Sequence, residues 1–318
     1  YADTRCAAFT LLRLAPTCKH SHCPTPGSQP LTNNGLIIAA FGRQYLVEFP
    51  DGTTRLCFPR GKKSELACGD QVAIMPTGDG QGVVEKTIER SSLLYRSNEF
   101  RQKLIAANVT QIAIVVATEP SFSDILVTRC LVAADSQEIK PLIVLNKCDL
   151  TDALPAARKA LEVYRTLGYA VVELSAKECG KALLPYLLGE TSVLVGQSGM
   201  GKSTLINALI PGADAATREI SEALDSGKHT TTHARLYHLD EKSNLIDSPG
   251  LQEFGLRHLA LSTLEAGFPE FQPFLGQCRF RDCHHDREPD CALRSAVNRG
   301  DITARRFACY HELRAELR

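Results

Sequence analysis

The segment from residue 191 to residue 209 constrains this chain more than any other part of its sequence. An apolar run from Thr191 to Val195 is followed by the pattern Gly-x-x-x-x-Gly-Lys-Ser and then by a helical run. A strand, a glycine-rich turn and a helix in this order predict a loop whose backbone N–H groups bind phosphate at the start of a helix. The loop residues are Gly196, Gln197, Ser198, Gly199, Met200, Gly201, Lys202, Ser203 and Thr204.

Side chains in and after this loop suit a nucleotide bound with Mg²⁺. Lys202 is expected to reach the β- and γ-phosphates, and Ser203 to ligate Mg²⁺. Downstream, Asp247 and Gly250 match the pattern Asp-x-x-Gly after the apolar run 244–246. We expect Asp247 to hold Mg²⁺ through water and the Gly250 amide to sense the γ-phosphate.

The phosphate-binding loop described above is called the P-loop below. Two further motifs upstream of it indicate the base of the nucleotide. One has the form Asn-Lys-x-Asp and resembles the guanine-specificity motif of GTPases, and the other, Ser-Ala-Lys, resembles their second guanine loop. Each follows an apolar run, and ligands of open α/β sheets bind at the carboxyl ends of strands. The pair therefore predicts binding of GTP and GDP. The residues are Asn146, Lys147, Asp149, Ser175, Ala176 and Lys177.

The order of these motifs is unusual. Ordinary GTPases run from the P-loop through the switches to the guanine motifs, whereas here both guanine motifs precede the P-loop. The termini of a Ras-like sheet are neighbours, so a chain that is cut elsewhere and rejoined keeps the same site. The order therefore predicts a circularly permuted GTPase domain.

The segment 227–232, Gly-Lys-His-Thr-Thr-Thr, is interpreted as the first switch. One of its threonines, Thr231 or Thr232, is expected to complete the Mg²⁺ shell. Leu251 stands where many GTPases carry a water-orienting glutamine, so hydrolysis should be slow unless another residue supplies that group. We predict His229 as this catalytic residue; the alternative is that His229 is only a polar loop residue.

A cluster of cysteine and histidine follows the GTPase motifs. Cys278, Cys283, His285 and Cys291 offer three thiolates and one imidazole, a closed tetrahedral set typical of structural Zn²⁺, with His284 as the alternative nitrogen ligand. Arginines and one phenylalanine surround the cluster, as expected of a surface that contacts RNA phosphates. They are Arg279, Phe280, Arg281, Arg287, Arg294, Arg299, Arg305 and Arg306.

Outside these motifs, the pattern of apolar and polar residues predicts a multidomain chain. Four or five short alternating runs between residues 31 and 90 predict a small OB-like β-barrel. One barrel loop carries Arg60, Lys62 and Lys63, either for RNA or as the solvated loop of a structural barrel. We expect the parts to be a disordered tail (1–30), the barrel (31–95), a circularly permuted α/β P-loop GTPase domain (96–265) and a mostly helical zinc-binding domain (266–318).

Composition excludes several classes of protein. The 36 basic and 36 acidic residues give no net charge, so any surface for nucleic acid must be local. No apolar run approaches the roughly 18 residues of a membrane span, and we expect no membrane partner. The 12 cysteines are scattered until the cluster, which argues against a disulfide framework and for a reducing, cytoplasmic compartment.

Barrel, permuted GTPase and Cys₃His cluster together resemble the ribosome small subunit-dependent GTPase A family of bacteria and organelles, from Leu31 to the C-terminus. The resemblance implies a late-stage assembly factor that binds the small ribosomal subunit and its rRNA. It also implies GTP hydrolysis that the subunit stimulates and that is coupled to release, with a role in hydrolysis for His229. The competing hypothesis is a regulatory GTPase acting on a protein target through its barrel and zinc domain. In either case we expect a monomer.

Overall fold

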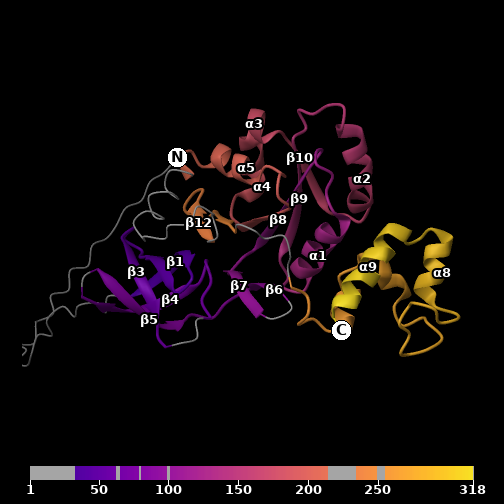
Figure 1. Cartoon of the computed structure of the whole chain (residues 1–318), viewed down its shortest axis with the longest axis horizontal. Helices are drawn as coiled ribbons and strands as arrows, with labels where there is room; N and C mark the ends of the chain where they lie inside the picture. Colours follow the sequence, from indigo (N-terminus) through magenta and orange to yellow (C-terminus); the bar gives the residue numbers. More distant parts are fainter. Residues whose placement is uncertain are drawn as a thin grey trace, which may run out of the picture. The chain divides into compact units, whose positions relative to one another are not determined.

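The computed structural model describes residues 33–61, 65–78, 80–98, 101–213, 234–248 and 255–317. Within these ranges a five-stranded barrel, an α/β sheet with helices on both faces and a helical C-terminal region follow one another (Figure 1). This architecture confirms the predicted fold class. The predicted tail, residues 1–30, lies outside the described residues.

The barrel closes through the return of its fourth strand to its first. Its strands are β1 (Asn34–Phe41), β2 (Gln44–Glu48), β3 (Thr54–Pro59), β4 (Gln71–Thr77) and β5 (Gln81–Thr87). They pair in the order β1-β2-β3-β5-β4, and β4 also pairs with β1. Successive side chains of a strand point to opposite faces, so alternate residues such as Ile37, Val47 and Ile74 form the barrel core.

A hairpin that the sequence analysis did not anticipate follows the barrel. It consists of β6 (Leu93–Asn98) and β7 (Arg101–Ala107), which pair antiparallel. The predicted boundary at residue 96 falls inside this hairpin. Buried Leu94 and Ile105 attach the hairpin to the core of the α/β sheet, so it belongs to the junction between the two parts.

The α/β sheet has the strand order β10-β9-β8-β11-β13-β12. All neighbours are parallel except β12, which runs antiparallel to β13. All seven residues of β8 are buried, as expected of a strand covered on both faces. The strands are β8 (Gln111–Ala117), β9 (Lys140–Asn146), β10 (Ala170–Glu173), β11 (Thr191–Val195), β12 (Arg235–His238) and β13 (Asn244–Asp247).

Helices cover both faces of this sheet, with α1 and α2 on one side and α3, α4 and α5 on the other (Figure 1). Ile114 of β8 belongs to the core cluster of α1 and α2, whereas its neighbour Val115 belongs to the cluster of α5. The elements are α1 (Asp124–Asp135), α2 (Leu154–Thr166), α3 (Ala176–Cys179), the 3-10 turn η1 (Gly180–Leu183), α4 (Leu184–Leu187) and α5 (Lys202–Leu209).

The barrel continues directly into the α/β sheet. Strand β1 pairs antiparallel with β12, with Ala39 opposite Arg235, and the backbone N–H of Ala40 donates to the carbonyl of Ala234 (3.2 Å). Nearby, Nε2 of His238 lies 2.6 Å from a carboxylate oxygen of Glu48 in β2. The first strand of the barrel is therefore also a neighbour of the edge strand of the α/β sheet.

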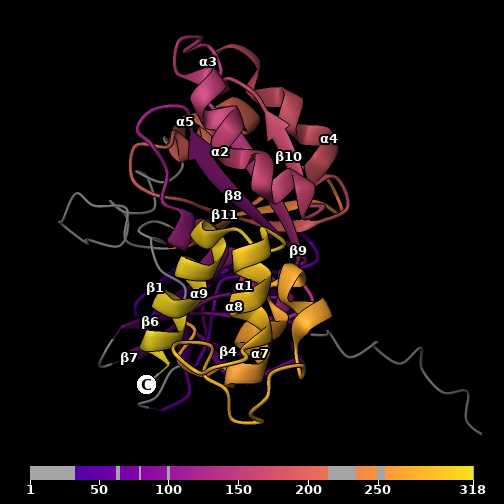
Figure 2. The ribbon, with the colours of Figure 1, turned by 90° about the vertical axis from the view of Figure 1, so that its right-hand side faces the viewer.

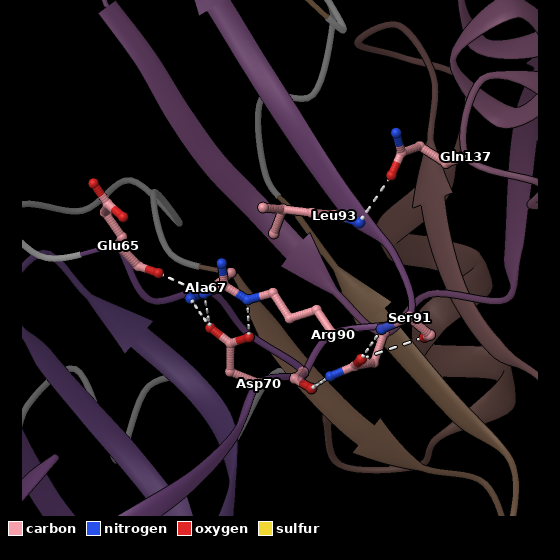
Figure 3. A network of polar contacts seen from close by, with 9 residues as sticks. Glu65, Ala67, Asp70, Arg90, Ser91, Leu93 and Gln137 are labelled. Carbon is pink, nitrogen blue, oxygen red and sulfur yellow. Dashed lines mark hydrogen bonds and ion pairs between the residues drawn. The ribbon is translucent and has the colours of Figure 1, made fainter. Parts of the chain in front are cut away.

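A network of polar contacts fixes the junction between barrel and sheet (Figure 3). The fully buried carboxylate of Asp70 accepts from Nε of Arg90 (2.6 Å), from a terminal nitrogen of Arg90 (2.8 Å) and from the Ala67 amide (2.7 Å). Asn108 joins the same network, because its side chain accepts from the Ser91 amide and donates to a barrel carbonyl. The segment that leaves the barrel is thus tied to a barrel loop.

The C-terminal region packs on α1 of the α/β domain (Figure 2). Its elements are α7 (Leu261–Ala266), the 3-10 turn η2 (Pro269–Phe274), α8 (Ala292–Arg299) and α9 (Ala304–Glu316). A Cβ at Gly267 would lie 3.0 Å from a methyl group of Val132, so glycine permits this close approach. None of the helices in the described residues is long and apolar enough to cross a bilayer.

We expect Arg90→Ala to lower the free energy of unfolding by about 3 kcal/mol, because the buried Asp70 carboxylate would lose its charged partner. Urea unfolding measures this loss. Arg158→Ala is the matched control, since Arg158 pairs with Glu173 at an exposed position and should change stability little. If Arg90→Ala lowers the free energy of unfolding as little as Arg158→Ala does, the junction network does not stabilise the fold.

Candidate nucleotide site and metal centre

The P-loop connects β11 to α5, as the sequence predicts, and its backbone requires glycine at two positions. A Cβ at Gly196 would collide with the carbonyl of Val115 in β8. Gly201, the N-cap of α5, has a left-handed backbone (φ +87°), and a Cβ there would collide with the side-chain nitrogen of Asn146. The loop can therefore lie against β8 and β9 only because these residues have no side chain.

The side chain of Lys202 curls back over the loop. Its ammonium donates to the carbonyls of Gly196 (2.6 Å) and Gln197 (2.8 Å). Burial lowers the pKa of Lys202 below its ordinary value, and the nearby charge of Asp247 opposes this effect. A cation is thus held at the mouth of a loop whose helix N-terminus also favours anions.

Asn146 connects the P-loop to both guanine motifs. Its buried side chain donates to the carbonyl of Met200 (2.8 Å) and accepts from the amides of Lys147 and Ala176 (2.8 Å each). Three segments that are distant in the sequence therefore meet at one amide group. This is the arrangement expected when the carboxyl ends of neighbouring parallel strands share one edge of the sheet.

The other guanine-motif residues lie around Asn146. Asp149 is half-buried, and the adjacent Ser175 side chain, more than the nearby Lys177 and Lys147, holds the pKa of its carboxyl below the ordinary value. The carboxylate therefore stays ionised well below neutral pH, as an acceptor for guanine must. Lys147 has a left-handed backbone (φ 63°) that turns the chain sharply after β9.

Asp247 ends β13, where it lies opposite Leu194 of the P-loop strand. Its charge acts on Lys202, and Ser203 and Thr204 are exposed at the start of α5. The described part of the site thus brings together the P-loop, both guanine motifs and Asp247. The predicted residues His229, Thr231, Thr232 and Gly250 lie outside the described residues.

Residues that follow β8 also contact the site, and the sequence analysis missed them. The Lys147 ammonium donates to the carbonyl of Glu119 (2.8 Å), and the Thr118 hydroxyl donates to the carbonyl of Lys147 (3.0 Å). No motif marks this segment. It follows the carboxyl end of a central buried strand, where ligands of open α/β sheets bind, and this position alone could have marked it as part of the site.

The cysteine and histidine cluster is formed in the C-terminal region. The ligand atoms of Cys278, Cys283, His285 and Cys291 all lie within 4.8 Å of one another. Nδ1 of His285 is 3.3 Å from Sγ of Cys291 and 3.5 Å from Sγ of Cys278. Such a set of thiols and one imidazole fits a tetrahedral metal ion. His284, the alternative ligand, is exposed and does not belong to the cluster.

Neighbouring residues orient the ligands of this cluster. Nε2 of His285 lies 3.4 Å from a carboxylate oxygen of Glu265, which also accepts from the Tyr310 hydroxyl (2.9 Å). Carboxylates commonly hold the second nitrogen of a metal-binding histidine in this way. The cluster therefore has both the donors and the outer support that a metal site needs.

The arginines around the cluster do not all face the solvent. Arg279, Arg281 and Arg287 are exposed, and so is Phe280, whose ring lies beside Arg279. Arg306 is fully buried between the C-terminal region and α1, so the expectation that it belongs to an RNA-facing surface is wrong. A buried arginine and an exposed one cannot be told apart by composition alone.

The sheet order, the P-loop and the guanine loops at neighbouring strand ends define a P-loop GTPase whose motifs are circularly permuted. The chain belongs to the RsgA GTPase family, whose model matches residues 87–257. It is similar to the small ribosomal subunit biogenesis GTPase RsgA of Nitrosospira multiformis, with 54% identity over 92% of this chain and 93% of that protein. The corresponding protein of Nitrosomonas europaea is 55% identical over 88% of this chain and 90% of its own.

Solved structures agree with this assignment. YjeQ from Thermotoga maritima is similar over 90% of this chain and 98% of its own, with a TM-score of 0.67 and 31% identity. YloQ, described as a circularly permuted GTPase, is similar over 89% of this chain and 94% of its own, with a TM-score of 0.64 and 29% identity.

Gly201→Ala should weaken GDP binding by roughly tenfold or more, because its Cβ would displace the Asn146 amide from the P-loop. Gly212→Ala is the matched control: Gly212 has the same φ of +87°, but nothing lies within 4 Å of its Cβ position. Calorimetric titration of GDP into both variants separates the collision from backbone strain. Equal losses of affinity would contradict the role given to Asn146.

Proposed function

We propose that this protein binds GTP with Mg²⁺, hydrolyses it, and acts on the small ribosomal subunit as a late-stage assembly factor, with hydrolysis coupled to release. The observation that carries the proposal is the Asn146 amide, which holds a P-loop and two guanine loops in one site. The names of the relatives, which are small ribosomal subunit biogenesis GTPases, support the partner. The place of action is then the cytoplasm, where such subunits are assembled.

Each group of the nucleotide has a matching residue in this proposal. Asp149 accepts from guanine, and the backbone of the P-loop holds the phosphates together with Lys202. Ser203 and one of the threonines Thr231 and Thr232 ligate Mg²⁺, Asp247 holds it through water, and the Gly250 amide contacts the γ-phosphate. The depressed pKa of Asp149 and the proximity of Asp247 to Lys202 support these roles.

Contacts with rRNA are assigned to two basic surfaces. On the barrel, a shallow hollow is lined by the exposed Arg60 and Lys86, next to Glu65 and Glu85. In the C-terminal region, exposed Arg279 lies beside the ring of Phe280, and this pair suits a phosphate next to an unstacked base. Lys62 and Lys63 of the predicted barrel loop lie outside the described residues.

We assign Zn²⁺ to the cluster, because three thiols and one imidazole are the donors that a structural zinc ion prefers. Wild-type protein washed with chelator should retain one Zn²⁺ per chain, and Cys283→Ser should lose it. Cys179→Ser, which removes an exposed thiol outside the cluster, is the control and should retain the metal. Equal zinc in all three proteins, or none in the wild type, would refute the assignment.

The function is tested by comparing GTPase rates in buffer, with free rRNA and with purified small subunits. We expect slow turnover in buffer and strong stimulation by subunits, since Leu251 cannot orient water. His229→Ala should keep its nucleotide affinity and lose most of the stimulated turnover, roughly ten- to a thousandfold. It should then stall on the subunit in the GTP state.

Two results would overturn these assignments. Absence of stimulation by subunits would contradict the ribosomal partner and favour a protein target. Near-normal turnover of His229→Ala at saturating subunit concentration would contradict the catalytic role. In that case weak binding of the variant to subunits, measured with a non-hydrolysable GTP analogue, would assign His229 to docking.

A further inference from the structure

The side chain of Gln197 in the P-loop contacts the start of α1. Its carbonyl oxygen accepts from the backbone amide of Ser123 (3.0 Å), the N-cap residue of α1. The Ser123 hydroxyl in turn accepts from the amide of Leu126 in the first turn of that helix (3.4 Å). The P-loop thus rests on a helix terminus that has an ordered cap of its own.

Asp124, the first residue of α1, is bound by the C-terminal region. Arg305 of α9 donates from two nitrogens to the carboxylate of Asp124, and its third donates to the carbonyl of Ala160 in α2 (2.9 Å). The Tyr164 hydroxyl donates to the same carboxylate (3.1 Å). Two-pronged pairing of arginine with a carboxylate fixes orientation as well as distance, so α9 sets the position of the α1 N-terminus.

Helix α9 is attached to α1 along its length and reaches the metal cluster. Buried Arg306 donates to Glu270 (2.6 Å) and to the Thr128 hydroxyl of α1 (2.8 Å), and Glu316 pairs with Arg129. Tyr310 of the same helix donates to Glu265, the carboxylate beside the cluster ligand His285. A continuous series of packed, polar contacts therefore runs from the metal cluster to the P-loop.

We propose that Gln197 and Arg305 are positioning residues of the nucleotide site, and that through them the C-terminal metal region and the P-loop stabilise each other. The proposal rests on the nucleotide binding proposed above. Gln197 acts through its contact with α1 rather than by touching the phosphates with its side chain. Arg305 acts from α9, through its ion pair with Asp124 of α1.

Thermodynamic linkage makes the coupling reciprocal. If the C-terminal region stabilises the nucleotide-binding form of the P-loop, bound nucleotide must stabilise the docked form of α9 to the same extent. Couplings of this kind change affinities by about five- to a hundredfold. This stabilisation of α9 by nucleotide appears in a region remote from the nucleotide. A local defect of the P-loop would not produce it.

The first test measures release of fluorescently labelled GDP from the full chain with its metal bound. Arg305→Ala should release GDP about fivefold faster or more than the wild type. Arg305→Lys, which keeps a positive charge beside Asp124, should release GDP at a rate between those of the wild type and Arg305→Ala. Lys140→Ala is the control, because Lys140 pairs with Glu190 at the start of β9, the end opposite to Asn146, and should leave release unchanged. Metal content and thermal unfolding identify any variant that fails to fold.

The second test measures hydrogen exchange of the α9 amides with and without GDP. In the wild type, GDP should slow exchange in α9. In Gln197→Met, which has a similar volume but lacks the carbonyl acceptor, saturating GDP should leave α9 exchange unchanged. A wild type that does not bind GDP contradicts the proposed function; a wild type that binds GDP with unchanged α9 exchange contradicts the coupling alone. Release from Arg305→Ala at the wild-type rate also overturns it.

Discussion

The buried amide of Asn146 is the contact on which the rest of the nucleotide site depends. It satisfies groups from the P-loop, from its own motif and from the second guanine loop at once. A buried polar group that loses its partners costs about 1–3 kcal/mol, so the three segments are favoured only as a set. This requirement concerns neighbours in space and not their order along the chain, which is why a permuted order of motifs is compatible with the same site.

The sequence predicted those parts of the structure that follow from local pattern. Apolar runs placed the four strands β9, β10, β11 and β13, and the parallel arrangement of strands brought Asn146, Ser175 and Lys202 to one edge, as expected. Contacts between distant segments left no such signal. The pairing of Ala39 with Arg235 and the ion pair of Asp124 with Arg305 each join residues that no periodicity connects. The hairpin β6–β7 was missed because its short runs resemble the strands on either side.

The C-terminal region combines two kinds of stabilisation. Phe268, Phe271 and Tyr310 belong to the same core cluster as α1, so apolar burial joins this region to the GTPase domain. The loop that carries the cluster has few buried residues apart from His285 and Cys291. We expect such a loop to take a defined conformation when its ligands bind a metal ion, whereas α9 is held by packing and by buried Arg306.

The pairing of β1 with β12 bears on how the chain is synthesised. The barrel strands leave the ribosome early, but the edge of β1 at Ala39 and Ala40 acquires its partner only when synthesis has passed Arg235. At typical bacterial elongation rates this interval is on the order of ten seconds or more. During it, the backbone groups of that edge stay open to any strand that approaches. The α/β sheet thus covers this barrel edge late in synthesis, and a fragment that ends before β12 leaves the backbone at Ala39 and Ala40 without this partner.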